Sequence, residues 1–112
     1  MDIPLSIDLD TLLNDPDAWE PFRKGIQVHW FYRTDENGPS AALLKYDPGA
    51  TVPEHEHVGY EHILVLQGSQ IDENGVHSVG ELTVNPPGTR HSVASPHGCI
   101  VYAVWERPVR FA

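Results

Sequence analysis

Residues 49–68, GATVPEHEHVGYEHILVLQG, carry two histidines and a glutamate at a spacing that restricts how the chain can fold. His55, His57 and Glu61 lie at offsets of two and four residues, and every second side chain of a β-strand points to the same face. A helix would align His57 with Glu61 but would turn His55 away from both, and Pro53 opposes a helix. We therefore predict an extended segment with all three side chains on one wall of a sheet.

The residues after Glu61 predict a buried strand. Ile63 to Leu66 form a continuous apolar run that ends at Gly68, which is typical of a strand buried on both faces. Strict alternation directs Ile63, Val65 and Gln67 inward and His62, Leu64 and Leu66 outward. The outward apolar face needs a cover, either the N-terminal residues or a second barrel.

A second segment, residues 80–95, supplies a further metal-ligating side chain. Pro86, Pro87 and Gly88 form a tight turn that can return His91 to the sheet. Together with the first segment, His91 gives three imidazoles and one carboxylate, a donor set that suits Fe(II), Mn(II), Ni(II), Cu(II) or Zn(II). It does not resemble a structural zinc site, which is usually thiolate-rich and closed.

Apolar and β-branched runs recur along the rest of the chain, separated by turns rich in glycine and proline. The predicted strands span residues 26–32, 41–46, 69–71, 76–79, 82–85, 91–94 and 99–105, with Asn74-Gly75 as a hairpin turn. In the first strand, Ile26, Val28, Trp30 and Tyr32 are expected to share one face. No long helical pattern is present, so the sequence predicts an all-β barrel or sandwich.

Composition restricts the class of protein further. The chain has 112 residues, which we interpret as one domain over residues 1–112, with residues 1–20 as an arm. Its formal net charge of -9, with no basic cluster, excludes nucleic acid and anionic membranes as expected partners. No apolar stretch approaches the ~20 residues of a membrane span, and the first ten residues do not read as a signal peptide, so we predict a cytoplasmic protein.

The single cysteine, Cys99, excludes an internal disulfide. We interpret it as a small apolar side chain in a buried strand; the alternative is a redox-active thiol near the metal.

Both segments resemble the two motifs of the cupin superfamily. The first matches G-x5-H-x-H-x3-E-x6-G at every fixed position. The second matches G-x5-P-x-G-x2-H-x3-N except that Ser95 stands where the family usually has Asn, a residue that is not a ligand. The resemblance implies a small double-stranded β-helix, the RmlC-like jelly-roll barrel, with one divalent metal inside one mouth. It also implies the ligand set His55, His57, Glu61 and His91, and a homodimer formed through outward apolar surfaces.

Four protein ligands would leave two positions of a six-coordinate metal for water, oxygen or a bidentate anion. We therefore predict a non-haem, metal-dependent enzyme, similar to small cupin dioxygenases, that acts on a small anionic or enolisable substrate. The residues that could line or gate the mouth, without an assigned role, are Tyr60, Gln67, Arg90, Tyr102 and Trp105.

The alternative is a non-catalytic metal-binding sensor or ligand-binding module. The stretches HEHVGYEHILVLQG, NPPGTRH and GC resemble the cupin half of ChrR-type anti-sigma factors, which respond to oxidants. Few residues precede the first strand and only one cysteine is present, so the N-terminal helical zinc domain of those factors is not expected here. We accordingly expect no direct anti-sigma role.

Overall fold

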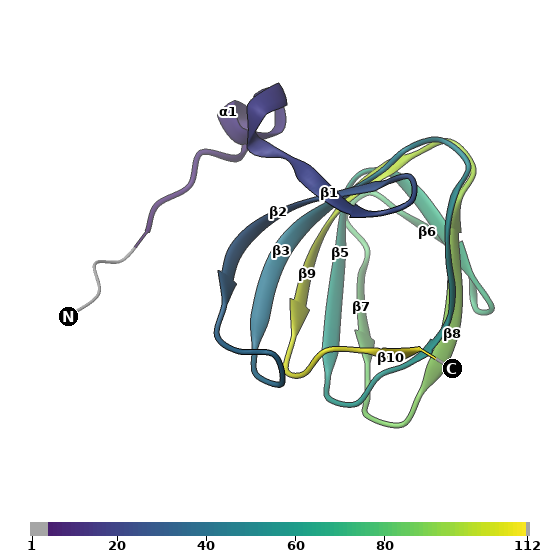
Figure 1. The fold of residues 1–112 in the computed structure, drawn as a ribbon. Coiled ribbons are helices and arrows are strands. Elements are labelled where there is room, and N and C mark those ends of the chain that lie inside the picture. The colour runs from purple at the N-terminus through teal and green to yellow at the C-terminus, as the bar shows by residue number, and fades with distance from the viewer. Residues whose placement is uncertain (1–4, 112) are drawn as a thin grey trace.

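Within residues 5–111, ten β-strands curl into a barrel preceded by a short helical segment (Figure 1). The structure is a computed structural model that describes residues 5–111. Its elements are α1 (Leu9–Leu13), the 3-10 turn η1 (Pro16–Ala18), β1 (Glu20–Arg23), β2 (Ile26–Arg33), β3 (Ser40–Tyr46), β4 (Ala50–Glu56), β5 (Glu61–Asp72), β6 (Gly75–Ser78), β7 (Leu82–Asn85), β8 (Arg90–Ser95), β9 (Cys99–Trp105) and β10 (Arg110–Phe111). The strand order is β1-β2-β3-β9-β5-β8-β4-β10, with β6 and β7 also beside β5. The predicted all-β barrel is confirmed.

Strand β5 joins the two walls of the barrel. Its first half pairs with β9 and β7, and its second half pairs with β6 and β8. The strand bends at Gly68, whose φ of 71° lies in the left-handed region. A Cβ atom there would collide with the carbonyl oxygen of Gly98, so only glycine fits at this crossing.

The core consists of side chains that point into the barrel and alternate along each strand. Its members include Ile26, Val28, Val65, Val101 and Ala103, each at most 2% exposed. The alternation predicted for residues 62–66 is confirmed, because Ile63 and Val65 are buried whereas His62 is exposed. The run is therefore not buried on both faces, since Leu64 and Leu66 remain partly exposed.

Two β-bulges overturn predictions about which way side chains point. The register between β2 and β3 shifts between Trp30 and Tyr32, so Tyr32 leaves the predicted inner face and is 47% exposed. The register between β5 and β9 shifts between Val65 and Gln67, and Gln67 is exposed rather than directed inward. A bulge inserts one residue into one strand and reverses the facing of all residues beyond it.

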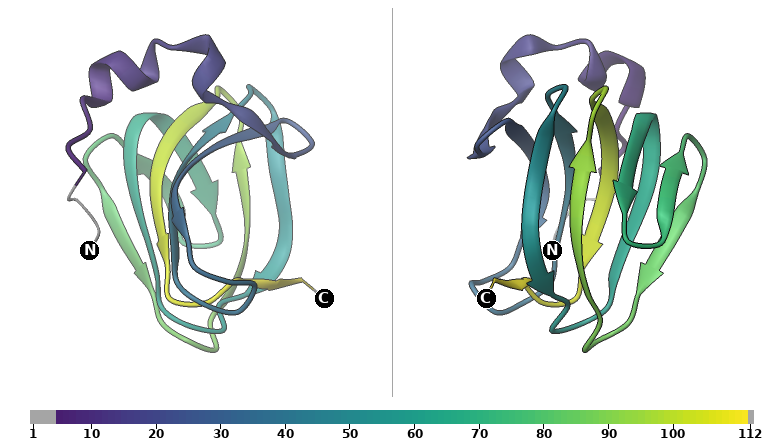
Figure 2. Two further views of the ribbon diagram at one scale, coloured as in Figure 1. Left: turned by 60° about the vertical axis from the view of Figure 1, so that its left-hand side comes forward. Right: turned by 90° about the vertical axis from the view of Figure 1, so that its right-hand side faces the viewer.

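Residues 5–9 of the N-terminal arm run along the outside of the barrel. Asp8 caps α1 by accepting a hydrogen bond from the backbone N–H of Thr11. Figure 2 shows the helical part of the arm at the opposite end of the barrel from β10. Leu5, Ile7 and Leu9 share a groove with outward residues of β2, β3, β5 and β9 but stay partly exposed, so the arm covers this apolar face incompletely. Within residues 5–111, no helix has the length and apolar character of a membrane span.

Candidate metal centre

His55 and His91 face each other across the ladder between β4 and β8. They are direct register partners, and their ring centroids lie 4.6 Å apart. The register shifts between Val52 and His55, in a stretch that contains Pro53, which cannot donate a ladder hydrogen bond. This bulge directs both Val52 and His55 into the barrel, although they are three residues apart.

Glu61 reaches the centre from a different strand than predicted. Strand β4 ends at Glu56, the chain turns, and Glu61 is the first residue of β5 in the facing wall. The prediction that one extended strand carries His55, His57 and Glu61 is therefore wrong. Backbone hydrogen bonds hold the turn, because Gly88 N–H donates to His57 O and Glu106 N–H donates to Tyr60 O. The spacing of the three residues fits a β-turn-β connection as well as it fits a single strand.

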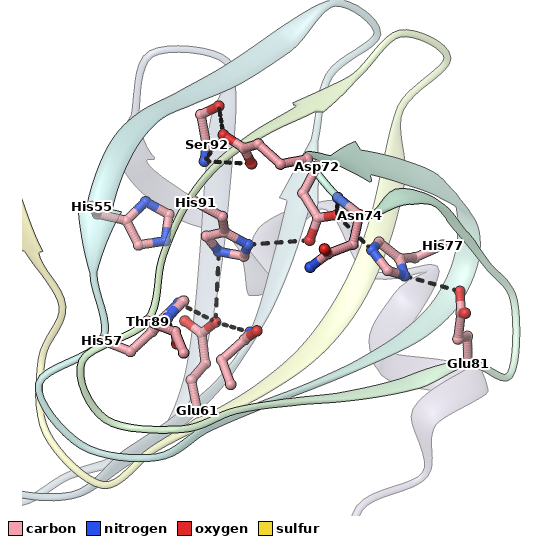
Figure 3. Close-up of polar contacts among 12 residues, drawn as sticks. His55, His57, Glu61, Asp72, Asn74, His77, Glu81, Thr89, His91 and Ser92 are labelled. Carbon is pink, nitrogen blue, oxygen red and sulfur yellow. Dashed lines mark hydrogen bonds and ion pairs between the residues drawn. The ribbon is translucent and has the colours of Figure 1, made fainter.

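The four predicted ligand residues come together inside the barrel. His55, His57, Glu61 and His91 each offer one ligand atom, and these atoms lie within 4.8 Å of one another (Figure 3). All four side chains belong to buried residues, from 1% to 7% exposed. The cluster is of the kind that holds a metal in cupins.

The hydrogen bonds of the three imidazoles fix the same tautomer in each ring. His55 Nδ1 lies 3.0 Å from the Pro53 carbonyl oxygen, which can only accept, and His91 Nδ1 lies 3.1 Å from Asp72 Oδ2. His57 Nδ1 lies 2.9 Å from Thr89 Oγ1, whose own proton is donated to the Pro86 carbonyl at 2.6 Å. Each Nδ1 therefore carries a proton, and Nε2 is the ring nitrogen of each histidine that is available to bind a cation.

One contact indicates directly that a cation fits here. Among residues 5–111, His57 Nε2 is buried without a hydrogen-bond partner, yet it lies 3.0 Å from Glu61 Oε1. Both atoms can serve as metal ligands, and a divalent ion bound by both would satisfy the buried nitrogen. The residues present therefore fit a bound metal.

The Glu61 carboxylate is held by two donors from neighbouring strands. Asn85 Nδ2 donates to Oε1 at 2.9 Å, and the Trp105 indole N–H donates to Oε2 at 2.7 Å. Burial opposes ionisation of this carboxyl, but His57 and Trp105 outweigh it and hold the pKa of Glu61 below its ordinary value. Burial also lowers the pKa of His55. Both shifts favour the ligating forms, a carboxylate and a neutral imidazole.

A cavity of about 520 Å³ extends from this cluster into the barrel. His55, Glu61 and His91 line it on one side, and most of the remaining wall is apolar, including Ile63 and Val93. The Arg23 guanidinium also borders the cavity and stacks over Phe111, with its central carbon 4.1 Å from the ring centroid. The Phe111 ring lies in turn 5.6 Å from the ring of His55.

Five residues were predicted to line or gate the mouth without an assigned role. Within residues 5–111, Trp105 is the one among them whose side chain hydrogen-bonds to a predicted ligand. Arg90 pairs with Glu56 at 2.9 Å on the surface, and Tyr60 is 49% exposed. Tyr102 belongs to the outer groove, and Gln67 is exposed. Cys99 is buried, and burial raises the pKa of its thiol, in keeping with the interpretation as an apolar side chain.

Sequence reasoning missed Asn85, Thr89 and Asp72, which orient the ligand side chains. Thr89 lies two residues from His91 inside the second motif, so its position offered a local signal. Asp72 lies 19 residues before His91, and only the pairing of β5 with β8 brings the two strands together. No spacing rule could have connected them.

Comparisons with known proteins agree with this architecture. Residues 12–110 match the family described as the ChrR cupin-like domain. The anti-sigma-E factor ChrR of Cereibacter sphaeroides is 35% identical over 77 residues, which cover 66% of this chain and 36% of that protein. The chain therefore spans little more than a third of the length of this curated relative.

Solved structures with the same fold include a dioxygenase and a complex of a sigma factor with its anti-sigma factor. An acetylacetone dioxygenase from Acinetobacter johnsonii superposes with a TM-score of 0.81 at 15% identity, covering 99% of this chain and 78% of that one. The complex of SigE with the anti-sigma ChrR from Rhodobacter sphaeroides gives 0.69 at 23% identity, covering 93% and 70%. At these identities the likeness shows the fold, and the predicted cupin jelly roll is confirmed. With the family match over most of its length, the chain belongs to the ChrR cupin-like domain family of the cupin superfamily.

Proposed function

We propose that His55, His57, Glu61 and His91 bind one divalent transition metal, with Fe, Mn, Ni, Zn and Cu as the candidates. The observation that carries this proposal is the buried contact of 3.0 Å between His57 Nε2 and Glu61 Oε1, because both are metal-ligand atoms and this nitrogen has no hydrogen-bond partner among residues 5–111. When bound, the metal would supply Lewis acidity and open positions for oxygen and a chelating anion. Burial favours the neutral form of His55, and the donors around Glu61 favour its carboxylate form.

The function that this centre supports best is a dioxygenase-like reaction on a small anionic or enolisable substrate. The apolar wall of the cavity would exclude water and accept a carbon skeleton, while the metal side would take the chelating oxygens. Arg23, held over Phe111 near His55, is placed to attract an anionic group of the substrate. The shared fold of the acetylacetone dioxygenase supports this reading by analogy alone.

The test is oxygen uptake by the Fe(II)-loaded protein with a panel of diketones, thiols and keto acids. We expect turnover with at least one class, and we expect a His91→Ala variant to be inactive. Arg23→Gln should raise the KM for an anionic substrate while leaving metal content unchanged. Absence of oxygen uptake with every compound, in protein that carries a full complement of iron, would contradict the enzyme proposal.

The second candidate is a metal-binding sensor or ligand-binding module without turnover. It is favoured by the family match and by the 35% identity to an anti-sigma factor. For this candidate, the loaded protein would bind a small ligand or respond to an oxidant but would consume no oxygen catalytically. Titration of the same panel, followed by the change in metal absorption, separates binding from turnover.

We further propose that the chain forms a homodimer in the cytoplasm. The incompletely covered outer face supports a second copy as the remaining cover, because Leu82 and Val84 of the neighbouring strand β7 are 59% and 48% exposed. A dimer mass by light scattering at micromolar concentration is the expected result, and a monomer mass would contradict it.

A further inference from the structure

A chain of hydrogen bonds leads from the metal cluster to the protein surface (Figure 3). His91 Nδ1 lies 3.1 Å from Asp72 Oδ2, and Asp72 Oδ1 lies 2.9 Å from His77 Nε2. The second nitrogen of the same ring, His77 Nδ1, lies 3.1 Å from Glu81 Oε2. Exposure of the side chains rises from 4% at Asp72 through 13% at His77 to 48% at Glu81. The chain thus connects a buried predicted ligand with solvent through three further residues.

The hairpin of β5 and β6 holds this chain in place. Asp72 ends β5 and pairs with Gly75, while His77 stands opposite Gln70 in the same ladder. The backbone N–H of Asn74 donates to Asp72 Oδ1 at 2.9 Å, and the backbone N–H of Ser78 donates to Glu81 Oε2 at 3.1 Å. Both carboxylates therefore have a fixed orientation on either side of the His77 ring.

The chemistry of the acceptors determines the state of His77. Carboxylate oxygens only accept hydrogen bonds, so both ring nitrogens of His77 must donate, and the ring is an imidazolium. Its partial burial opposes this charge, but Asp72 and Glu81 outweigh it and raise the pKa of His77 above its ordinary value. A cation fixed on Oδ1 holds the Asp72 carboxylate so that Oδ2 faces His91.

We propose that His77, held between Asp72 and Glu81, is a positioning residue for the metal centre. It fixes the Asp72 carboxylate against His91 Nδ1 and thereby sets the tautomer, ring orientation and donor strength of the His91 Nε2 atom. The inference rests on the proposed role of His91 as a metal ligand. It assigns a function to three residues that are not fixed positions of the cupin motifs, Asp72, His77 and Glu81.

Two substitutions test the role of His77 against a matched control. His77→Phe keeps the ring size but removes both donors, and His77→Gln retains one amide that can still donate to Asp72. The control is Glu73→Ala. Glu73 accepts from Ser92 Oγ at 2.8 Å and so ties the same hairpin to β8, next to His91, without touching a predicted ligand.

The first readout needs no metal. Nitrogen-15 NMR of the imidazoles in the metal-free protein should show His91 as the Nδ1–H tautomer in the wild type and in Glu73→Ala. In His77→Phe we expect a mixture with the Nε2–H tautomer, and in His77→Gln a smaller change. If His91 keeps the same tautomer in both His77 variants, the proposal is overturned.

The second readout is affinity for Co(II), measured by competition with a chelator. We expect His77→Phe to lose roughly ten- to a hundredfold, His77→Gln less, and Glu73→Ala to stay within about twofold of the wild type. Equal losses in His77→Phe and Glu73→Ala would mean that the hairpin acts only as a structural tether, and the positioning role would be refuted. A wild-type protein that binds no Co(II) would refute the proposed metal site instead, while the tautomer measurement would still decide the role of His77.

Discussion

Replacing Trp105 by phenylalanine should lower both the free energy of unfolding and the metal affinity, because one hydrogen bond is lost. The indole N–H donates to Glu61 Oε2 at 2.7 Å. Among residues 5–111, no other group donates a hydrogen bond to this oxygen. Glu61 is 5% exposed, so water cannot readily replace the indole. A hydrogen bond to a charged, buried group contributes about 1.5–3 kcal/mol, so the free energy of unfolding of the metal-free protein should fall by that amount.

Trp30→Phe is the matched control, because it removes the same atoms from a neighbouring ring. The Trp30 and Trp105 ring centroids lie 6.0 Å apart in one aromatic cluster. Urea unfolding in the presence of a chelator should place Trp105→Phe about 2 kcal/mol below Trp30→Phe. Its metal affinity should also fall by roughly ten- to a hundredfold, since a loosened carboxylate is a poorer ligand. If the two variants had the same stability and the same metal affinity, Trp105 would be a packing residue only.

Three further predictions follow from other parts of the fold. Gly80 has a positive φ similar to that of Gly68 but open space around it, so Gly80→Ala should destabilise the protein by roughly 1–2 kcal/mol and Gly68→Ala by more. Equal melting temperatures of the two variants would contradict this. The raised pKa of His77 implies stabilisation that is fully present below about pH 6.5 and is lost as the pH rises through the folded-state pKa; His77→Gln should remove this dependence from urea unfolding curves of the metal-free protein. Metal added at a hundred times its Kd should raise the free energy of unfolding by about 2.7 kcal/mol, and calorimetry that detects no stabilisation would contradict binding to the folded state.

Much of the barrel could be predicted because its strands are bounded by residues with strong local preferences. The predicted strands at residues 82–85 and 99–105 coincide with β7 and β9, and the Asn74-Gly75 hairpin forms as expected. The clustering of the predicted ligand residues could be anticipated because His55, His57 and His91 flank turns that glycine and proline define. The short edge strands β1 and β10 were missed, since four and two residues carry too little pattern to detect.

The remaining wrong predictions concern the direction in which side chains point and the contacts between residues distant in sequence. Local sequence patterns do not encode either property. Bulges reverse the facing of Tyr32 and Gln67, and nothing in the alternation of those segments marks the inserted residue. The turn after β4 likewise leaves the spacing unchanged while it places His57 just past the end of β4 and Glu61 at the start of β5. Asp72 reaches His91 only because the bend at Gly68 carries β5 into the second wall.

The most direct test of the account is the metal content of the purified chain after dialysis against each candidate ion. Elemental analysis should find one divalent metal per wild-type chain, and none in His57→Ala, which lacks the nitrogen that faces Glu61. A wild-type protein that holds no stoichiometric metal, and takes none up on addition of any of these ions, would contradict the assignment of the four side chains as a metal centre.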